Sequence, residues 1–208
     1  AKPQVFTFGA KPGLPATAEL QKMIDDVAAK GGGLVTVPPG DHVVGSIALK
    51  SGIELRLEKG ARILGTQDWR DYPLGSLIAA TDAANVSITG EGVIDVRGDR
   101  RHFIRKETPV RPNALRFENC ANIMIENIAI LNSAAWTVVF TRCDGVVVRG
   151  IQLFSHANHN NDGIDVCGTR NVLIENSRID ADDDGIVLKA WDENMVVENV
   201  EVRNCRVA

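Results

Sequence analysis

The chain has little of several features that would have placed it in a common class of protein. Four cysteines in 208 residues are too few for a disulfide scaffold, and aromatic residues make up only 5%. Positive charge is not in excess, because the net charge is −4 and the pI is near 5.6. No apolar run approaches the roughly 20 residues of a membrane span. We therefore expect no nucleic-acid partner and no membrane partner.

The N-terminus also lacks a basic segment followed by an apolar one, the pattern of an uncleaved secretory signal. The start at Ala1 is compatible with an exported protein, secreted or periplasmic, whose signal has been removed. The cysteines leave the redox compartment open. Cys120 and Cys143 occupy equivalent repeat positions, which favours a stacked interior column over a disulfide, and nothing in the cysteine pattern resembles a metal site. We predict no metal and no cofactor.

What the sequence does have is a short phrase that recurs through its second half. Asn or Gly is followed by alternating aliphatic residues and then by Gly or Asn, at 85–90, 122–127, 145–150, 171–176 and 194–199. A second alternating piece follows the later copies, at 128–132, 151–155, 177–181 and 200–204. Such alternation, rich in Val and Ile, predicts β-strands, and no helical pattern separates them. Several strands in each repeat favour a solenoid of stacked coils, a β-helix.

The N-terminal part differs from these repeats. Residues 17–30 place Leu20, Met23, Ile24 and Val27 on one face of an expected helix, with Thr17 as N-cap and the glycines at 31–33 as its end. Since a solenoid needs its open end covered, we predict that this helix is the N-terminal cap. The chain stops partway through the repeat pattern without a second capping element. We therefore expect one domain over 1–208, with strand and cap in 1–32, coils in 33–208, and an incomplete C-terminus.

Two copies of Asp-Gly-Ile, beginning at Asp162 and Asp184, lie 22 residues apart. Residues one coil apart become lateral neighbours at the inter-strand spacing, roughly 4.8 Å. The expected column contains Asn113, Trp136, Asp162 and Asp184, with Asp183 beside it. Crowded carboxylates push their pKa values apart, so that one can act as an acid and another as a base. Glycoside hydrolysis needs this division of roles, and an aromatic side chain one coil away offers a face for a sugar ring.

Three simpler interpretations stay open at this point. Asp-Gly is common in turns, so either copy alone is compatible with a structural role. Trp136 is compatible with a core position. Clustered carboxylates are also compatible with a calcium site, because hard cations bind several oxygen ligands.

The sequence resembles glycoside hydrolase family 28, the polygalacturonase family. The resemblance covers nearly the whole chain and is strongest in "ITGEGVID" (88–95), "LRFENCANIMIENIAILNSAAWTVVF" (115–140) and "NNDGIDVCGTRNVLIENSRIDADDDGIVLK" (160–189). It implies an all-β, right-handed parallel β-helix and hydrolysis with inversion. The family's Asn-Thr-Asp motif corresponds to 160–162, with Asn161 in place of Thr, and its Gly/Gln-Asp-Asp motif to 182–184, with Asp182 in place of Gly or Gln.

The resemblance implies that Asp183 is the general acid and that Asp162 and Asp184 hold and activate the attacking water. The family's later Gly-His-Gly and Arg-Ile-Lys motifs are absent from these 208 residues, and no histidine follows the acid pair. By position, His159 does not correspond to the family histidine and is expected to line the cleft or a turn.

The expected substrate is an anionic polysaccharide. Residues 97–111 contain six Arg or Lys against two acids in an otherwise acidic chain, so this segment is a candidate either for uronate binding or for a solvated loop. Lys189, by alternation after the acid pair, is expected to bind substrate or to temper the acidic cluster. The full set of expected substrate-binding residues is Arg105, Arg111, Asn113, Trp136, His159, Asn160, Asn161 and Lys189.

The leading functional hypothesis is hydrolysis of α-galacturonosyl linkages in pectin or a rhamnogalacturonan-type polymer. A calcium-dependent elimination on the same polymer is the first alternative. A catalytically incomplete β-helix that binds carbohydrate is the second.

Overall fold

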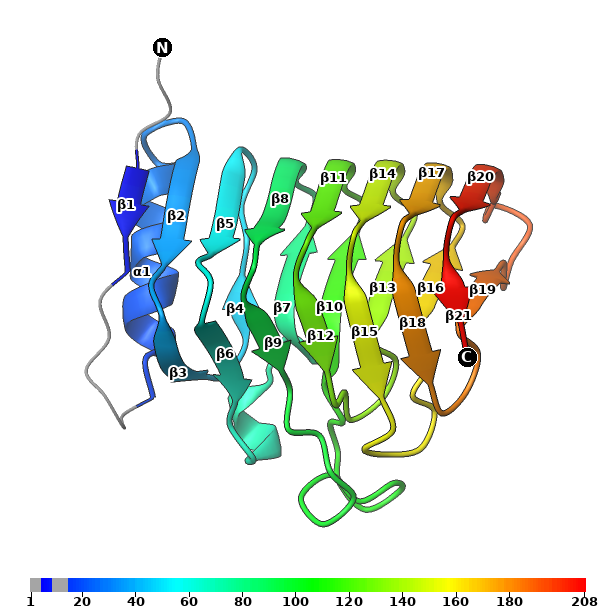
Figure 1. Cartoon of the computed structure of the whole chain (residues 1–208), viewed down its shortest axis with the longest axis horizontal. Coiled ribbons are helices and arrows are strands. Elements are labelled where there is room, and N and C mark those ends of the chain that lie inside the picture. The colour runs from blue at the N-terminus through cyan, green and yellow to red at the C-terminus, as the bar shows by residue number, and fades with distance from the viewer. Residues whose placement is uncertain (1–4, 9–14) are drawn as a thin grey trace.

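The computed structural model describes residues 5–8 and 15–208, which wind into a parallel β-helix (Figure 1). Successive coils lie side by side from the N-terminal to the C-terminal end and form three sheets. In the described residues the first sheet contains β1 (Val5–Thr7), β2 (Gly33–Val37), β5 (Ile53–Leu57), β8 (Ala84–Gly90), β11 (Ala121–Glu126), β14 (Asp144–Arg149), β17 (Arg170–Glu175) and β20 (Glu198–Arg203). The second contains β4 (Ile47–Ala48), β7 (Ser76–Thr81), β10 (Asn113–Glu118), β13 (Val138–Thr141), β16 (Ile164–Cys167) and β19 (Ile186–Lys189). The third contains β3 (Gly40–Val44), β6 (Ala61–Gly65), β9 (Val93–Asp95), β12 (Ala129–Leu131), β15 (Gln152–Ser155), β18 (Arg178–Ala181) and β21 (Arg206–Val207). The predicted fold class is confirmed.

Inward-facing aliphatic residues hold the coils together. In the first sheet, Ile123, Val146 and Val172 are register partners on β11, β14 and β17, and all three are buried. Alternate residues of a strand point to opposite faces, so each strand contributes only every second side chain to the interior. Stacking turns these short contributions into one continuous core that extends from the cap helix to Ile179. The boundaries of the single domain proposed from the sequence remain a prediction.

Asparagine is frequent because it shapes the corners between sheets. Of the 14 described non-glycine residues with positive φ, ten are Asn. Asn tolerates this left-handed conformation better than most residues do. The amides also bond from coil to coil: Asn122 Nδ2 donates to Asn85 Oδ1 at 3.2 Å, and Asn199 Nδ2 donates to Asn171 Oδ1 at 3.0 Å. These ladders fix the corner of the coil.

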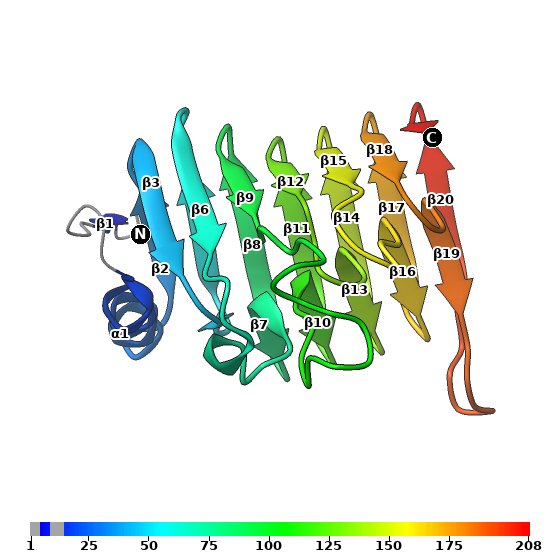
Figure 2. The ribbon, with the colours of Figure 1, turned by 90° about the horizontal axis from the view of Figure 1, so that it is seen from below.

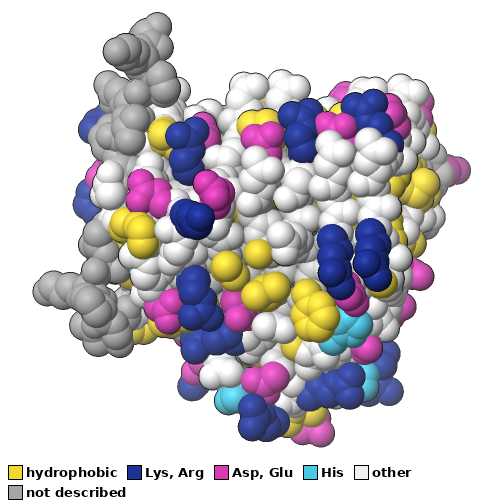
Figure 3. Space-filling view, in the orientation of Figure 1, with side chains coloured by type: hydrophobic (Ala, Val, Ile, Leu, Met, Phe, Trp, Pro, Cys, Tyr) yellow, Lys and Arg dark blue, Asp and Glu magenta, His cyan; other side chains and the backbone are white. Residues whose placement is uncertain are grey.

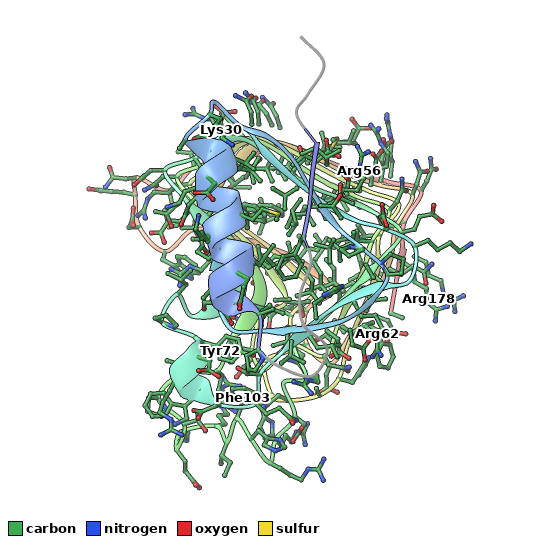
Figure 4. The ribbon with its side chains drawn as sticks, turned by 90° about the vertical axis from the view of Figure 1, so that its left-hand side faces the viewer. Lys30, Arg56, Arg62, Tyr72, Phe103 and Arg178 are labelled. Carbon is green, nitrogen blue, oxygen red and sulfur yellow. The ribbon has the colours of Figure 1, made fainter. Side chains whose placement is uncertain are left out.

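The predicted cap helix is present as α1 (Thr17–Ala28), which lies against the N-terminal end of the stack (Figures 1 and 4). It buries Leu20, Ile24 and Val27. The predicted N-cap was wrong: Ala16 precedes the helix, and no side chain caps it. Thr17 instead accepts a hydrogen bond at Oγ1 from the Gly45 backbone N–H at 2.8 Å, so its hydroxyl ties the helix to the first coil.

One repeat assignment was also wrong. Residues 194–199 were expected to be a fifth copy of the strand phrase, but β20 begins at Glu198, and Val200 is the register partner of Val172. The segment predicted as a second piece, 200–204, therefore belongs to the first sheet, and β21 follows in the third. The cause is the connection from β19 to β20, residues 190–197, which projects at the C-terminal end of the stack (Figure 2).

The cysteine expectation is confirmed. Cys120 and Cys143 directly precede the partners Ala121 and Asp144, are buried, and are free thiols. In the part of the chain that the structure describes, no helix combines the length and the apolar character needed to cross a membrane.

Residues 96–112 join β9 to β10 and project from one edge of the stack (Figure 1). We call this segment the basic loop. Phe103 anchors it, being fully buried with its ring edge-on to Tyr72 at a centroid distance of 5.8 Å; both are labelled at its base in Figure 4. The space-filling view shows Lys, Arg and His side chains gathered on this projection (Figure 3).

Candidate active site

The two Asp-Gly-Ile copies stack as the spacing predicted. Ile164 and Ile186 are register partners, and extending that register by two residues places Asp162 beside Asp184. The Gly163 N–H donates to the Asp184 carbonyl at 2.8 Å, which joins the two coils at this point. On the other side, Val138 partners Ile164, so that Trp136 precedes Asp162 in the same column.

The glycines of these copies are required by close approach between coils. A Cβ at Gly163 would lie 2.3 Å from the Gly185 carbonyl oxygen and 2.7 Å from Ile179 Cγ2. Neither distance is compatible with a side chain. The Asp-Gly pairs are therefore packing features of stacked coils, and they bring the two aspartates together.

Half of the acidic cluster is buried. Asp162 is 4% exposed and Asp165 is fully buried. Lys189 Nζ donates to Asp162 Oδ2 at 2.7 Å and also to Asp165 Oδ1. One ammonium group thus bridges two carboxyl groups in a largely buried site.

This arrangement changes the titration of the groups involved. Burial raises the pKa of Asp165 to about 7; the Lys189 charge opposes this shift, and neighbouring Asp162 adds to it. Burial opposes the charge of Lys189, but its hydrogen bonds to Asp162 and Asp165 outweigh that effect and raise its pKa. Asp165 can therefore hold a proton near neutral pH, as a crowded carboxyl pair requires.

The other half of the cluster is exposed. Asp183 and Asp184 both face solvent, and Asp183 Oδ1 accepts the Asp184 backbone N–H at 3.1 Å. Asp182 lies 3.6 Å from Arg100 of the basic loop and 3.5 Å from Nδ1 of His156. Arg100 and His156 flank these exposed carboxylates on one side, and the exposed side is open to a substrate.

Asn161 has a structural role, contrary to the expectation that it binds substrate. It is fully buried. Its Nδ2 donates to the carbonyls of Ser133 at 2.9 Å and Ala135 at 2.8 Å, and its Oδ1 accepts the Asn158 N–H at 2.7 Å. The Asn amide donates two hydrogen bonds and accepts one in this turn, whereas a threonine hydroxyl has only one proton to donate. No side-chain donor of Asn161 is left for a sugar.

Asn160 holds its backbone in the left-handed region, at φ 56°, and presents its side chain to Arg111. Arg111 Nη2 donates to Asn160 Oδ1 at 3.3 Å, and Arg111 Nη1 donates to the carbonyls of His159 at 2.8 Å and Ala134 at 3.0 Å. Burial, followed by the charge of nearby Arg105, lowers the pKa of Arg111. The basic loop is thus fastened to the Asn160 turn.

A pocket of about 580 Å³ opens beside this turn. Four predicted site residues line it: Arg111, Asn113, Trp136 and Asn160. Arg116, which was not predicted, lines it as well. Arg116 is partly neutralised by Glu118, at 3.1 Å. Two guanidinium groups in one pocket suit an anionic ligand.

Trp136 is half-buried. It packs against a small apolar cluster and also lines the pocket. Its ring stacks on Trp191 at a centroid distance of 6.1 Å, and Lys189 Nζ lies 3.9 Å from its centroid. The remaining predicted residues are more peripheral. Arg105 and the His159 side chain are exposed, while Lys189 is mostly buried and engaged with Asp162 and Asp165.

Sequence reasoning missed Asp165, His156 and Arg100 as members of the cluster. Strand alternation places Asp165 on the outer face of β16, where a polar residue needs no explanation. Only its proximity to Lys189, one coil later, distinguishes it. His156 Nε2 contacts Asp180 Oδ1 at 2.7 Å, and that hydrogen bond lowers the pKa of Asp180.

Calcium binding found no geometric support in the residues that the structure describes, where no three His, Cys, Asp or Glu side chains converge on a metal position. The two buried carboxyl groups converge on an ammonium group instead.

A comparison with protein families identifies the family of this chain. The model of glycosyl hydrolases family 28 matches residues 30–205, which include the whole acidic cluster. The chain belongs to this family.

Individual relatives agree with that assignment. The chain is 30% identical, over 90% of its length, to a protein of Vitis vinifera named "Probable polygalacturonase", of which it covers 42%. It is 24% identical, over 90% of its length, to an endo-polygalacturonase of Pectobacterium carotovorum subsp. carotovorum, of which it covers 54%. The chain spans about half the length of these curated relatives.

Among solved structures, the hyperthermoactive exopolygalacturonase from Thermotoga maritima superposes with a TM-score of 0.88 at 25% identity. The match covers 99% of this chain and 61% of that enzyme. The coils described above therefore have the same fold as the corresponding part of that enzyme.

Proposed function

We propose that this protein hydrolyses α-galacturonosyl linkages in pectin or a rhamnogalacturonan-type polysaccharide. The observation that carries the proposal is the stacking of Asp162 beside Asp184, with Asp183 exposed next to them, in a family 28 chain. The sequence motif alone left a calcium site or a set of turns open at this position. The bridging ammonium group and the family membership both favour the hydrolase.

In the proposed mechanism Asp183 protonates the glycosidic oxygen as its bond to the anomeric carbon breaks. Asp162 and Asp184 hold a water molecule on the opposite face of the sugar and accept its proton as the new carbon–oxygen bond forms. The products are two sugars with free hydroxyl groups, and the configuration inverts. Inversion requires acid and base carboxyls roughly 6.5–9.5 Å apart. The exposed position of Asp183 suits a group that must reach the leaving oxygen.

The pocket beside the acids supports an anionic sugar as substrate. Arg111 and Arg116 line it together with Trp136 and Asn113. A guanidinium can bind a uronate carboxylate through two parallel hydrogen bonds. We propose that a galacturonate unit occupies this pocket, with Asn160 holding Arg111 in place. Arg105 and the His159 side chain, both exposed, would meet the polymer outside it.

A pectic substrate is extracellular, so the proposal includes a secreted or periplasmic location and a role in cell-wall polysaccharide degradation.

The test is release of reducing ends from polygalacturonic acid by this 208-residue chain, with and without EDTA. Asp183→Asn should abolish an EDTA-resistant activity, whereas Asp41→Asn, in an exposed ion pair with Arg62 on the third sheet, should retain it. An unsaturated product absorbing in the ultraviolet would overturn hydrolysis in favour of elimination. Binding without turnover, equal in Asp183→Asn, would indicate a carbohydrate-binding β-helix.

A further inference from the structure

Asp165 has no part in the mechanism proposed above, yet it is fully buried on β16. Its register neighbours on the flanking strands are Val139 and Val187. Neither side chain can donate a hydrogen bond. A carboxyl group in such surroundings is costly unless other groups satisfy it.

Lys189 compensates the negative charge of only one of the two carboxyl groups. Its ammonium contacts Oδ1 of Asp165 and Oδ2 of Asp162, and the ring of Trp136 lies on it at 3.9 Å. Two ionised carboxylates around one ammonium would leave a net negative charge in this buried site. Such a charge is strongly unfavourable away from water.

The second oxygen of each carboxyl group is also buried. Asp162 Oδ1 and Asp165 Oδ2 have no hydrogen-bond partner within the described part of the chain. The Asp162 and Asp165 side chains lie within hydrogen-bonding reach of each other. Two such acceptors without a donor are unfavourable, because buried polar atoms are nearly always paired. One proton placed between the two groups would supply the missing donor and bring the net charge of the site to zero.

The charged and titratable groups around Asp165 are few. Lys189 donates to Asp165 and to Asp162, and Cys167 follows Asp165 on the same strand. Burial raises the pKa of the Cys167 thiol to about 12, so it stays neutral in the range of interest. The proton therefore belongs to the pair of carboxyl groups, and the more deeply buried of them is Asp165.

We propose that Asp165 is a positioning residue for Asp162: protonated Asp165 donates from Oδ2 to Asp162 Oδ1, while Lys189 holds Asp162 Oδ2. This inference rests on the proposed function for its catalytic meaning. The Asp162 carboxylate is held at both oxygens and keeps one orientation toward the attacking water. When Asp165 loses its proton, the hydrogen bond is lost and a second buried negative charge appears.

The first test is a titration that needs no activity. In a chain with ¹³C-labelled aspartate, the carboxyl resonance that Asp165→Asn removes belongs to Asp165. Its midpoint should lie near pH 7, and a midpoint near the ordinary value of about 4 would overturn the proposal. Lys189→Gln should raise this midpoint further, whereas Lys22→Gln, in an exposed pair with Asp26, should leave it unchanged. If Asp165→Asn does not fold, conventional assignment of the wild-type spectrum gives the same midpoint.

The second test is the pH profile of polygalacturonic acid hydrolysis. The amide of Asp165→Asn can donate at every pH, so the alkaline fall of kcat/KM should move upward by about one pH unit or more. An unchanged alkaline limb in a folded, active variant would overturn the positioning role. Absence of hydrolysis in the wild type would instead overturn the proposed function and leave the titration to decide on the hydrogen bond.

Discussion

The acidic cluster contains two sets of carboxyl groups that lie close in the sequence but differ in burial and in the groups that they contact. Asp162 and Asp165 are buried and share one ammonium group. Asp183 and Asp184 lie one coil later and face solvent. In the first set each charge needs a defined partner, and removing one leaves the others unsatisfied. In the second set water screens the charges, so the residues are free to meet a ligand.

The difference shows how a β-helix can combine fixed and reactive groups in one column. In the described residues β16 lies between β13 and β19, whereas β19 is the edge strand of the second sheet and has a neighbour on one side only. The buried set is expected to govern stability and orientation, and the exposed set to govern the chemistry. The following experiments separate these contributions.

The largest expected effect is on catalysis by the exposed set. Asp183→Asn should lower the rate of polygalacturonic acid hydrolysis by about 10²–10⁴-fold, the usual contribution of a general acid. Because the side chain is exposed, the free energy of unfolding should change by no more than about 0.5 kcal/mol. A reducing-end assay measures the loss of rate, and urea unfolding of the same preparation measures the free energy of unfolding. A large loss of stability would place Asp183 with the buried set.

Next comes loss of the cation from the buried set. Lys189→Met leaves Asp162 and Asp165 without a compensating charge and should lower the free energy of unfolding by about 3 kcal/mol. Urea unfolding at neutral pH measures this. The matched control is Lys22→Met, which breaks an exposed pair with Asp26 and should cost under about 0.5 kcal/mol. Equal effects of the two substitutions would contradict the contrast between the sets.

The pH dependence of stability should carry the signature of Asp165. Its folded-state pKa, about 7, lies above its ordinary value of 3.8, so the folded protein keeps a proton that the unfolded chain has lost. The contribution of this group therefore favours folding below about pH 4 and declines as pH rises toward 7. Asp165→Asn should remove that decline, on the order of a few kcal/mol over the range. Urea unfolding of both proteins at pH 4, 5.5 and 7 tests it; parallel curves would contradict it.

The smallest expected effect concerns a cation beside the exposed set. Arg100→Gln removes a partner 3.6 Å from Asp182, where both side chains are about half exposed. The expected loss is at most about 1 kcal/mol and should fade in high salt. Thermal unfolding at low and high salt measures it. A larger, salt-independent loss would show that the basic loop is held by this contact.

Much of the fold was predictable because the coil imposes a simple pattern. Alternating aliphatic residues and recurrent Asn marked the strands and corners, and the spacing of Asp162 and Asp184 gave their register correctly. The strand β20 was misplaced because "NMVVEN" (194–199) has the same local pattern as a true corner and strand. Which of two similar phrases joins the sheet depends on the preceding loop, which leaves no periodic signal.

The candidate site was predictable only in part. Stacking placed Asn113, Trp136 and Asp162 together because a column needs only sequence spacing. The role of Asn161 was not predictable, since the carbonyls that bind its amide come from residues more than twenty positions away. Asp165 was missed for the same reason: alternation gives the face of a strand and not what covers that face.

The unequal lengths of the coils have a consequence for how such a protein can vary. The column from Trp136 to Asp162 to Asp184 takes steps of 26 and 22 residues, yet each step joins neighbouring strands in register. Turn length is therefore uncoupled from the spacing of the reactive groups. Segments such as the basic loop can be grafted, lengthened or exchanged to suit a different polymer while the distance between adjacent rungs stays set by backbone hydrogen bonds.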